Sequence, residues 1–135
     1  AQRAMRGALD QAGISPDRVG LINCHATGTP VGDLSEISAL KQVFGDALPL
    51  IPIQSTKGLV GHTLGAAGAI ETIAAIIQAE HGFIHGMPNF ENPDPCCENL
   101  RIHKETVRHP FSVVLKNAFG FGGHNASLIY RKEAE

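Results

Sequence analysis

The sequence has no tryptophan, a single tyrosine and no long apolar run. Because a membrane-spanning helix needs about 20 consecutive apolar residues, we expect no membrane span. The sequence also lacks a basic excess: 11 Lys and Arg stand against 13 Asp and Glu, for a net charge of −2. Nucleic acid as the main partner is therefore excluded, since phosphate binding needs a basic face.

Cysteine is scarce, and its three positions are Cys24, Cys96 and Cys97. The odd count and the adjacent pair exclude a disulfide framework and favour a reducing, cytoplasmic location. Cys24 directly precedes His25, but neighbouring side chains on a strand point to opposite faces. The two therefore do not form a ready Cys–His pair, and Cys24 is expected in the core.

A metal site is the alternative that the histidines raise. His81 and His85 have the i, i+4 spacing that could clamp a metal on a helix. However, Gly82 and Gly86 fall where that helix should end, and no cysteine or acidic ligand accompanies the pair at a known spacing. We therefore expect neither a metal nor a resident cofactor.

The 135 residues, 43% hydrophobic and 18% charged, fit one globular domain over residues 1–135. The chain begins without Met, in what reads as a helix already under way, so we expect a segment of a longer protein whose missing part lies upstream. The final RKEAE closely follows the last expected strand and looks like a natural end, which favours a stand-alone protein over a module of a larger chain.

The order of periodic segments predicts an α/β layered fold. Residues 33–44 form a helix with Asp33 as N-cap and Glu36 in a capping box. The other expected elements are a helix over 1–13, strands over 19–24 and 51–54, a helix through 70–77, a long loop over 87–110, and strands over 112–115 and 126–131 joined by a glycine-rich turn over 117–125.

The helix through 70–77 carries Ile70, Ile73 and Ile77 at helical spacing, and small residues precede it. Small residues allow close backbone approach, so this helix is expected to be buried. Glu71 lies on the same apolar helix. The alternative is that Glu71 lies on the exposed face of the helix, as glutamates usually do. The surrounding alanines and isoleucines favour burial instead, with Lys57 as the ion-pair partner.

Three polar segments follow strands or occupy tight turns, where functional groups are often displayed. They cover residues 25–29, 55–62 and 117–125. Taken alone, the first could be a simple turn, and the second does not match a phosphate-binding loop. The third could be a tight hairpin, although a backbone N–H in such a loop can also face a developing oxyanion.

In order, the motifs NCHATGTPVGD, STKGLVGHTLGAAGAIE and NAFGFGGHNA resemble the second half of the condensing β-ketoacyl-acyl carrier protein synthases of fatty acid and polyketide synthesis. The likeness runs over nearly the whole chain. It implies the C-terminal half of a thiolase-like fold, incomplete on its own, with a layered sheet and buried and flanking helices. It also implies a decarboxylating Claisen condensation, with a nucleophilic cysteine in the upstream half.

The resemblance assigns roles to individual residues. His25 and His62 match the family histidines that stabilise the enolate oxygen, and Lys57 matches the family lysine, with Glu71 as its acidic partner. In the pantetheine channel, Thr27 and Thr29 match hydroxyls that bind the pantetheine arm. Phe119 matches the gating aromatic whose N–H lies in the acyl oxyanion hole, and the adjacent Gly120 supports it.

The same resemblance implies that acyl carrier protein is the partner and brings its phosphopantetheine as a substrate arm rather than as a cofactor. The complete protein is expected to be a homodimer, and this chain alone should be inactive and expose an apolar face along residues 70–77. Two departures from the pattern stand out. Ala26 replaces the usual glycine of His-Gly-Thr, which matters only where the backbone needs a positive φ, and His124 stands where many members have Thr.

Two alternatives remain within the fold. A non-catalytic partner like the chain-length factors would have no reason to keep His25, Lys57 and His62 together. A thiolase-type enzyme would carry a second cysteine near the C-terminal glycine loop, and residues 119–125 contain none.

Overall fold

The structure is a computed structural model that describes residues 1–133. The last two residues of RKEAE, on which the expectation of a natural chain end partly rests, lie outside the described residues.

The helices are α1 (Gln2–Ala12), α2 (Pro30–Phe44), α3 (Lys57–Val60) and α4 (Ala67–His81), with 3₁₀ turns η1 (Pro16–Arg18), η2 (Gly45–Leu50), η3 (Leu64–Ala66), η4 (Pro95–Cys97) and η5 (Phe121–Gly123). The strands are β1 (Leu21–Asn23), β2 (Ile53–Gln54), β3 (Phe83–Ile84), β4 (Val107–Arg108), β5 (Val113–Gly120) and β6 (His124–Arg131).

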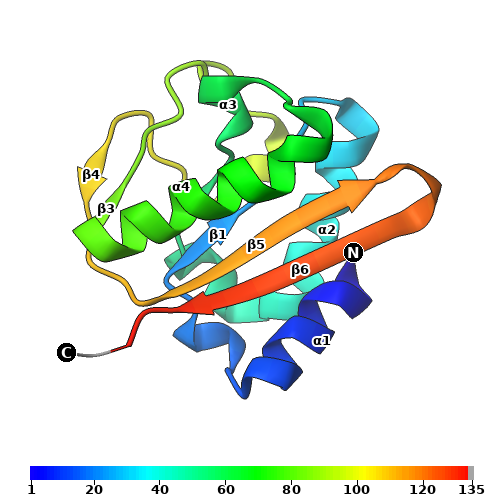
Figure 1. Cartoon of the computed structure of the whole chain (residues 1–135). Helices are drawn as coiled ribbons and strands as arrows, with labels where there is room; N and C mark the ends of the chain where they lie inside the picture. The colour runs from blue at the N-terminus through cyan, green and yellow to red at the C-terminus, as the bar shows by residue number, and fades with distance from the viewer. Residues whose placement is uncertain (134–135) are drawn as a thin grey trace.

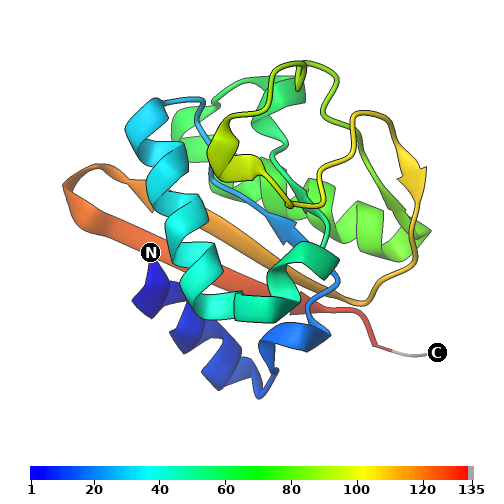
Figure 2. The same ribbon diagram turned by 180° about the vertical axis from the view of Figure 1, so that it is seen from behind.

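A mixed sheet in the order β2-β1-β5-β6 forms the centre of the molecule (Figure 1). β1 runs parallel to both β2 and β5, and β5 and β6 form an antiparallel hairpin. Helices α1 and α2 cover one face of the sheet and α4 covers the other, as the two opposite views show (Figures 1 and 2). The predicted α/β layered arrangement is thus confirmed.

Alternation along the strands divides the core into two layers. Ile22 and Leu115 pack with Met5 and Leu40 on the face of α1 and α2. Leu21 and Val114 pack with Ala75 of α4 on the other face. Successive residues therefore face different helices, which decides where each polar side chain at the strand ends is displayed.

Several predicted boundaries are wrong, among them the end of the strand over 112–115 and the loop over 87–110, which contains β4, and two of them affect the site. α2 begins at Pro30, with Thr29 as N-cap, so Asp33 is not the cap and Glu36 is buried inside the helix rather than part of a capping box. Proline is well suited to the first helical turn because its missing N–H would be unpaired there. The predicted loop over 117–125 is mostly strand: β5 and β6 continue to a turn of only residues 121–123, in which Gly122 and Gly123 have positive φ.

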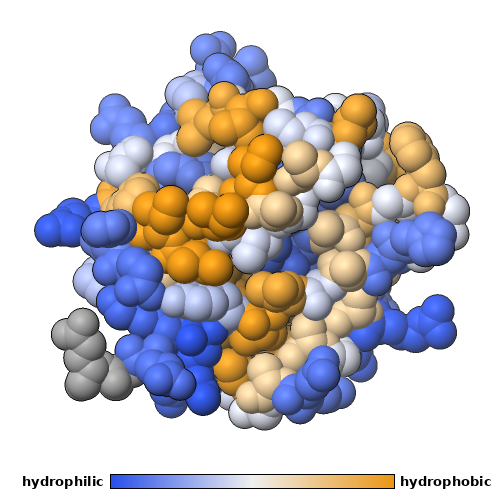
Figure 3. All heavy atoms as spheres, in the orientation of Figure 1, coloured by the Kyte–Doolittle hydropathy of each residue, from blue (hydrophilic) through white to orange (hydrophobic). Residues whose placement is uncertain are grey.

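α4 is buried on only one side. Glu71, Ala75 and Gln78 are buried, whereas Ile70, Ile73 and Ile77 are 38%, 57% and 47% exposed. The prediction of a buried helix is therefore wrong for its outer face, and the expected apolar face along residues 70–77 is present. Leu59, Val60 and Leu64 extend this face over α3 and η3 (Figure 3). Within residues 1–133, no helix has the length and apolarity needed to cross a membrane.

The turn after β1 is held by a side chain of α2 and by the side chain that directly follows β2. The carboxylate of Glu36 accepts the N–H groups of His25 and Ala26 at 2.9 and 2.8 Å, and the hydroxyl of Ser55 donates to the carbonyl oxygen of Ala26 at 3.3 Å. These bonds hold Ala26 at φ 24, in the region that disfavours residues with a Cβ, and Gly28 follows at φ 77. Ala26, which replaces the usual glycine of the His-Gly-Thr motif, therefore stands at a position where the backbone is strained.

This geometry predicts opposite effects for two exchanges. Ala26→Gly should raise the free energy of unfolding by about 0.5 kcal/mol, because relief of ~1–2 kcal/mol of left-handed strain outweighs the backbone entropy of glycine. The matched exchange Gly28→Ala should lower it by about 1 kcal/mol, since its Cβ would meet open space and only the φ is unfavourable. Urea denaturation of both variants measures the difference, and equal effects of one sign would contradict it.

Candidate active site

A buried carboxylate between two lysines forms the base of the candidate site. Lys57 Nζ and Lys116 Nζ each lie 2.6 Å from a different oxygen of Glu71. Lys57, Glu71 and Lys116 are 9%, 0% and 3% exposed. The predicted burial of Glu71 and the geometry of its pair with Lys57 are confirmed, whereas Lys116 was not anticipated.

Strand alternation explains why Lys116 reaches this place. Lys116 follows Val114 by two residues on β5, so both point towards α4, where Glu71 lies one helical turn before Ala75. The sequence carried a signal for this: a lysine directly follows the apolar strand 113–115. Because the strand was predicted to end at residue 115, Lys116 was not placed on its inward face.

His25 lies next to this cluster, with its ring nitrogen Nδ1 3.5 Å from Lys57 Nζ. An ammonium group can only donate, so Nδ1 must be the acceptor, and the proton of the neutral ring is on Nε2. Burial, followed by the positive charges of Lys57 and Lys116, lowers the pKa of His25 to about 4. The ring is therefore neutral at physiological pH and presents an N–H donor at Nε2.

His62 is oriented in the same way by a different donor. The backbone N–H of Leu64 donates to its Nδ1 at 3.2 Å, which again leaves Nε2 as the nitrogen that carries a proton and can donate. The rings of His25 and His62 meet edge to face with centroids 5.7 Å apart. The site thus brings two imidazole N–H donors together, which is an arrangement suited to a developing negative charge on oxygen.

The other predicted side chains lie around His25. The ring of Phe119, near the end of β5, is 5.6 Å from the ring of His25, and Gly120 is the last residue of that strand. The hydroxyls of Thr27 and Thr29 lie 3.1 Å apart on the exposed turn that leads into α2. The structure therefore gathers His25, His62, Lys57 and Phe119 closely, with the two threonines on the adjacent turn.

Sequence reasoning also missed the role of Glu36 and Asn117. Besides the N–H groups of His25 and Ala26, Glu36 accepts a hydrogen bond from the side-chain amide of Asn117 at 3.0 Å. Asn117 in turn accepts from the hydroxyl of Ser127 at 2.8 Å. This chain of bonds links α2, the turn that carries His25, and the β5–β6 hairpin, so it fixes the backbone of the site.

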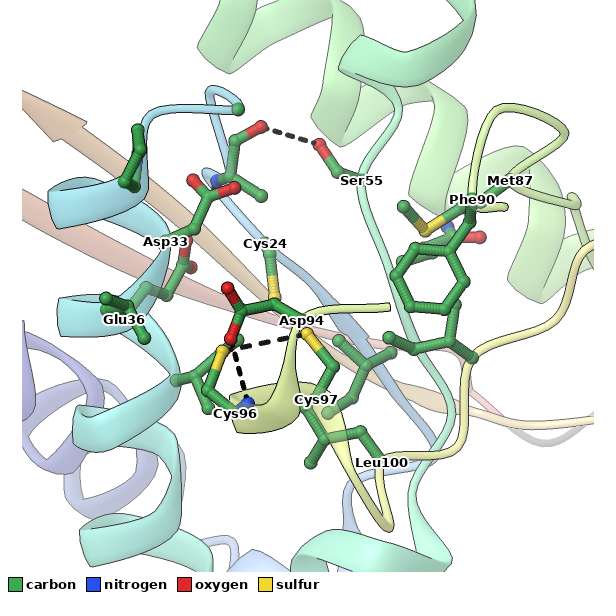
Figure 4. A pocket seen from close by; sticks show the side chains of 18 of the residues that line it. Cys24, Asp33, Glu36, Ser55, Met87, Phe90, Asp94, Cys96, Cys97 and Leu100 are labelled. Atoms are coloured by element: carbon green, nitrogen blue, oxygen red, sulfur yellow. Dashed lines mark hydrogen bonds between the residues drawn. The ribbon is translucent and has the colours of Figure 1, made fainter. Parts of the chain in front are cut away.

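The thiols lie on the other side of the sheet. Cys24, Cys96 and Cys97 line a cavity of about 350 Å³ between α2 and η4, and neither His25 nor His62 is among its lining residues (Figure 4). Burial, followed by the negative charge of Glu36, raises the pKa of the Cys24 thiol well above its usual value. Cys24 is thus an unreactive core residue, as predicted, and the adjacent Cys24 and His25 point in opposite directions.

The histidines considered as a metal clamp have other surroundings. His81 is the last residue of α4, whereas His85 lies beyond it, with one ring nitrogen 3.2 Å from the hydroxyl of Thr56 and the other 3.0 Å from the carbonyl oxygen of Gly86. Over the described residues, no three His, Cys, Asp or Glu side chains gather as a metal site would require.

Comparison with known proteins gives the site its context. Curated relatives include the 3-oxoacyl-[acyl-carrier-protein] synthase 2 of Staphylococcus aureus, 40% identical over 130 residues, and the chloroplastic 3-oxoacyl-[acyl-carrier-protein] synthase I of Hordeum vulgare, 43% identical over 123 residues. The matches cover 96% and 91% of this chain but 31% and 26% of those proteins. The chain therefore spans about a third of the length of these relatives or less.

Solved structures agree. A β-ketoacyl synthase from Burkholderia phymatum superposes with a TM-score of 0.91 at 36% identity, covering 98% of this chain and 32% of that one. A ketosynthase of a type II polyketide system, solved in complex with its acyl-carrier protein, superposes with a TM-score of 0.94 at 34% identity, covering 98% and 33%. These matches confirm the predicted thiolase-like α/β fold.

The family model described as "Beta-ketoacyl synthase, C-terminal domain" matches residues 1–91, which include His25, Lys57, His62 and Glu71. That range is more than half of the chain, and the sequence and structural neighbours are condensing enzymes of the same kind. The chain therefore belongs to the family of β-ketoacyl synthase C-terminal domains.

Proposed function

We propose that this chain is the C-terminal part of a β-ketoacyl-acyl carrier protein synthase, in which His25 and His62 stabilise the enolate formed when malonyl-acyl carrier protein loses carbon dioxide. The observation that carries the proposal is the orientation of the two rings. Each accepts a hydrogen bond at Nδ1, from Lys57 and from the N–H of Leu64, so each offers Nε2–H to a shared oxygen.

The reaction then follows from the positions of these groups. A cysteine upstream of this chain would hold the acyl group as a thioester. Cleavage of the bond between the malonyl carboxylate and its neighbouring carbon releases carbon dioxide, and the electron pair passes to the thioester oxygen. The N–H groups of His25 and His62 stabilise that oxyanion. The carbanion attacks the acyl carbon, the cysteine thiolate leaves, and the second oxyanion is assigned to the N–H of Phe119.

The substrate arm belongs to the partner protein. Phosphopantetheine reaches the site on acyl carrier protein and would be bound by the hydroxyls of Thr27 and Thr29, which lie together on the exposed turn beside His25. A solved relative at 34% identity is a ketosynthase in complex with its acyl-carrier protein. We extend that partnership to the protein that contains this chain, together with homodimer formation and a cytoplasmic location.

The non-catalytic alternative is less well supported. A partner subunit that only shapes a pocket has no need for a neutral His25 held between Lys57 and Phe119. The buried cluster of two lysines and Glu71 also has a high desolvation cost. Because this cluster contacts His25 through Lys57, its presence favours a catalytic subunit over a non-catalytic partner.

We also propose that the residues upstream of this chain cover the apolar face of α3 and α4. Ile73 and Leu64 are 57% and 75% exposed at the centre of this face, although their residue types favour burial. The chain spans about a third of its relatives, so the upstream part is long enough to supply the missing layer.

Exchange of the histidines tests the assigned chemistry. In the intact enzyme, His25→Ala or His62→Ala should lower malonyl decarboxylation by roughly a hundredfold or more, because one oxyanion donor is lost. Acyl transfer to the upstream cysteine should be at least partly retained. Release of labelled carbon dioxide and mass of the acyl-enzyme measure the two steps separately.

His81→Ala is the matched control, because His81 is exposed at the end of α4 and should affect neither step. If the two steps fall equally in the His25 and His62 variants, the enolate-stabilising role is wrong.

The apolar face gives a second test. The isolated 135-residue chain should bind a hydrophobic dye and show no condensation, because half of its site and the cover of α4 are absent. In the intact polypeptide, Ile73→Asp should lower the free energy of unfolding by about 2 kcal/mol or more, since a charge would be buried. Leu50→Asp, on η2 and 73% exposed, is the control. Condensation by the isolated chain would overturn the proposal.

A further inference from the structure

Lys116 is a buried lysine for which the proposed mechanism has no direct use. Its ammonium contacts one oxygen of Glu71 at 2.6 Å and also donates to the carbonyl oxygen of Asn117. Lys57 contacts the other oxygen of Glu71 at 2.6 Å. Each carboxylate oxygen therefore has its own ammonium group, and the cluster carries two positive charges and one negative charge.

This arrangement fixes the direction in which Lys57 can donate. Because Lys116 satisfies the second oxygen of Glu71, the ammonium of Lys57 is bound at one oxygen and remains directed at Nδ1 of His25, 3.5 Å away. Without Lys116, a fully buried carboxylate oxygen would have lost its cation. The single remaining ammonium would then be drawn between both oxygens, away from His25.

The charges that face His25 come from several elements. Three charged side chains act on its ring: Lys57 of α3, Lys116 of β5 and Glu71 of α4. The ring of His62 meets it edge to face, and Glu36 of α2 accepts its backbone N–H. Lys116 itself is faced by Glu71, Lys57 and Glu36. The Lys57–Glu71 pair is neutral by itself, whereas Lys116 adds one positive charge beside the ring.

We propose that Lys116 is a positioning residue of the condensation: it anchors Glu71 from the side opposite Lys57, keeps the Lys57 ammonium on Nδ1 of His25, and so maintains His25 as a neutral ring with its N–H directed at the enolate oxygen. The inference rests on the function proposed above. It concerns a residue that touches neither the substrate nor the histidine and acts through Glu71 and Lys57.

Burial and the neighbouring lysines, which lower the pKa of His25 to about 4, agree with this role. A His whose pKa is lowered is neutral above that pKa and gains a proton as the pH falls through it. Removing one of the nearby positive charges raises the pKa. The acid limb of the rate profile should therefore move to higher pH when Lys116 is replaced.

The test is Lys116→Met in the intact enzyme, which removes the charge and preserves most of the side-chain length. The pH at which malonyl decarboxylation is half lost on the acid side, here called the acid limb, should increase by about one pH unit. At neutral pH, kcat should fall roughly tenfold to a hundredfold through loss of alignment, with little change in KM. Lys132→Met, at the exposed ion pair with Glu80, is the matched control and should leave all three quantities unchanged.

A double variant separates charge balance from simple damage to the fold. Lys116→Met combined with Glu71→Gln removes one positive and one negative charge, so the net charge of the cluster returns to that of the parent. The acid limb should move back towards the parent value. If Lys116→Met alone does not fold, the acid limb of the double variant still tests the inference. A double variant whose acid limb stays as high as, or moves beyond, that of the single variant would overturn the inference.

The pH dependence of His25 carbethoxylation, followed by peptide mapping, reports ring protonation without turnover and should shift by the same amount. An active parent enzyme whose Lys116→Met variant is folded, with kcat, acid limb and His25 modification unchanged, overturns the role of Lys116 alone. A parent enzyme that forms the acyl-enzyme but never decarboxylates malonyl-acyl carrier protein overturns the proposed function, and this inference with it.

Discussion

The buried carboxylate of Glu71 is the interaction on which the rest of the site depends. A carboxylate that is fully removed from water is stable only where cations or hydrogen-bond donors replace its hydration. Here Lys57 and Lys116 come from α3 and β5 to meet it on α4. Because both ion pairs must form at once, the helix, the short helical turn and the central strand are fixed relative to one another. The position of His25 follows from that arrangement.

A second buried carboxylate completes the scaffold from the opposite face of the sheet. Glu36 on α2 binds the N–H groups of His25 and Ala26 and the amide of Asn117. Glu71 thus acts on the His25 side chain through Lys57, and Glu36 acts on its backbone. The left-handed backbone of Ala26 is held by these bonds, which is an example of local strain maintained by its surroundings next to a functional group.

The two faces of the sheet differ in how completely their apolar side chains are buried. The face of the sheet under α1 and α2 has a well-filled core, whereas α4 is buried on its inner side and apolar on its outer side. A surface helix with isoleucines exposed along one side is typical of an element with a further partner. The site and this apolar face lie on the same side of the sheet, so one covering segment could contact both, as the proposed upstream layer would.

The sequence by itself determined the order of the longer elements, the α/β class, the three polar segments and the pairing of Lys57 with Glu71, because periodicity, glycine position and motif spacing can be read from the sequence. It did not determine where β5 ends or where α2 begins, and it did not predict the short elements α3, β3 and β4. Pairing with β6 extended β5 to Gly120, and only that extension turned Lys116 towards Glu71. The second lysine was decided by tertiary structure, because the direction of a side chain depends on strand register and on the helix packed against it.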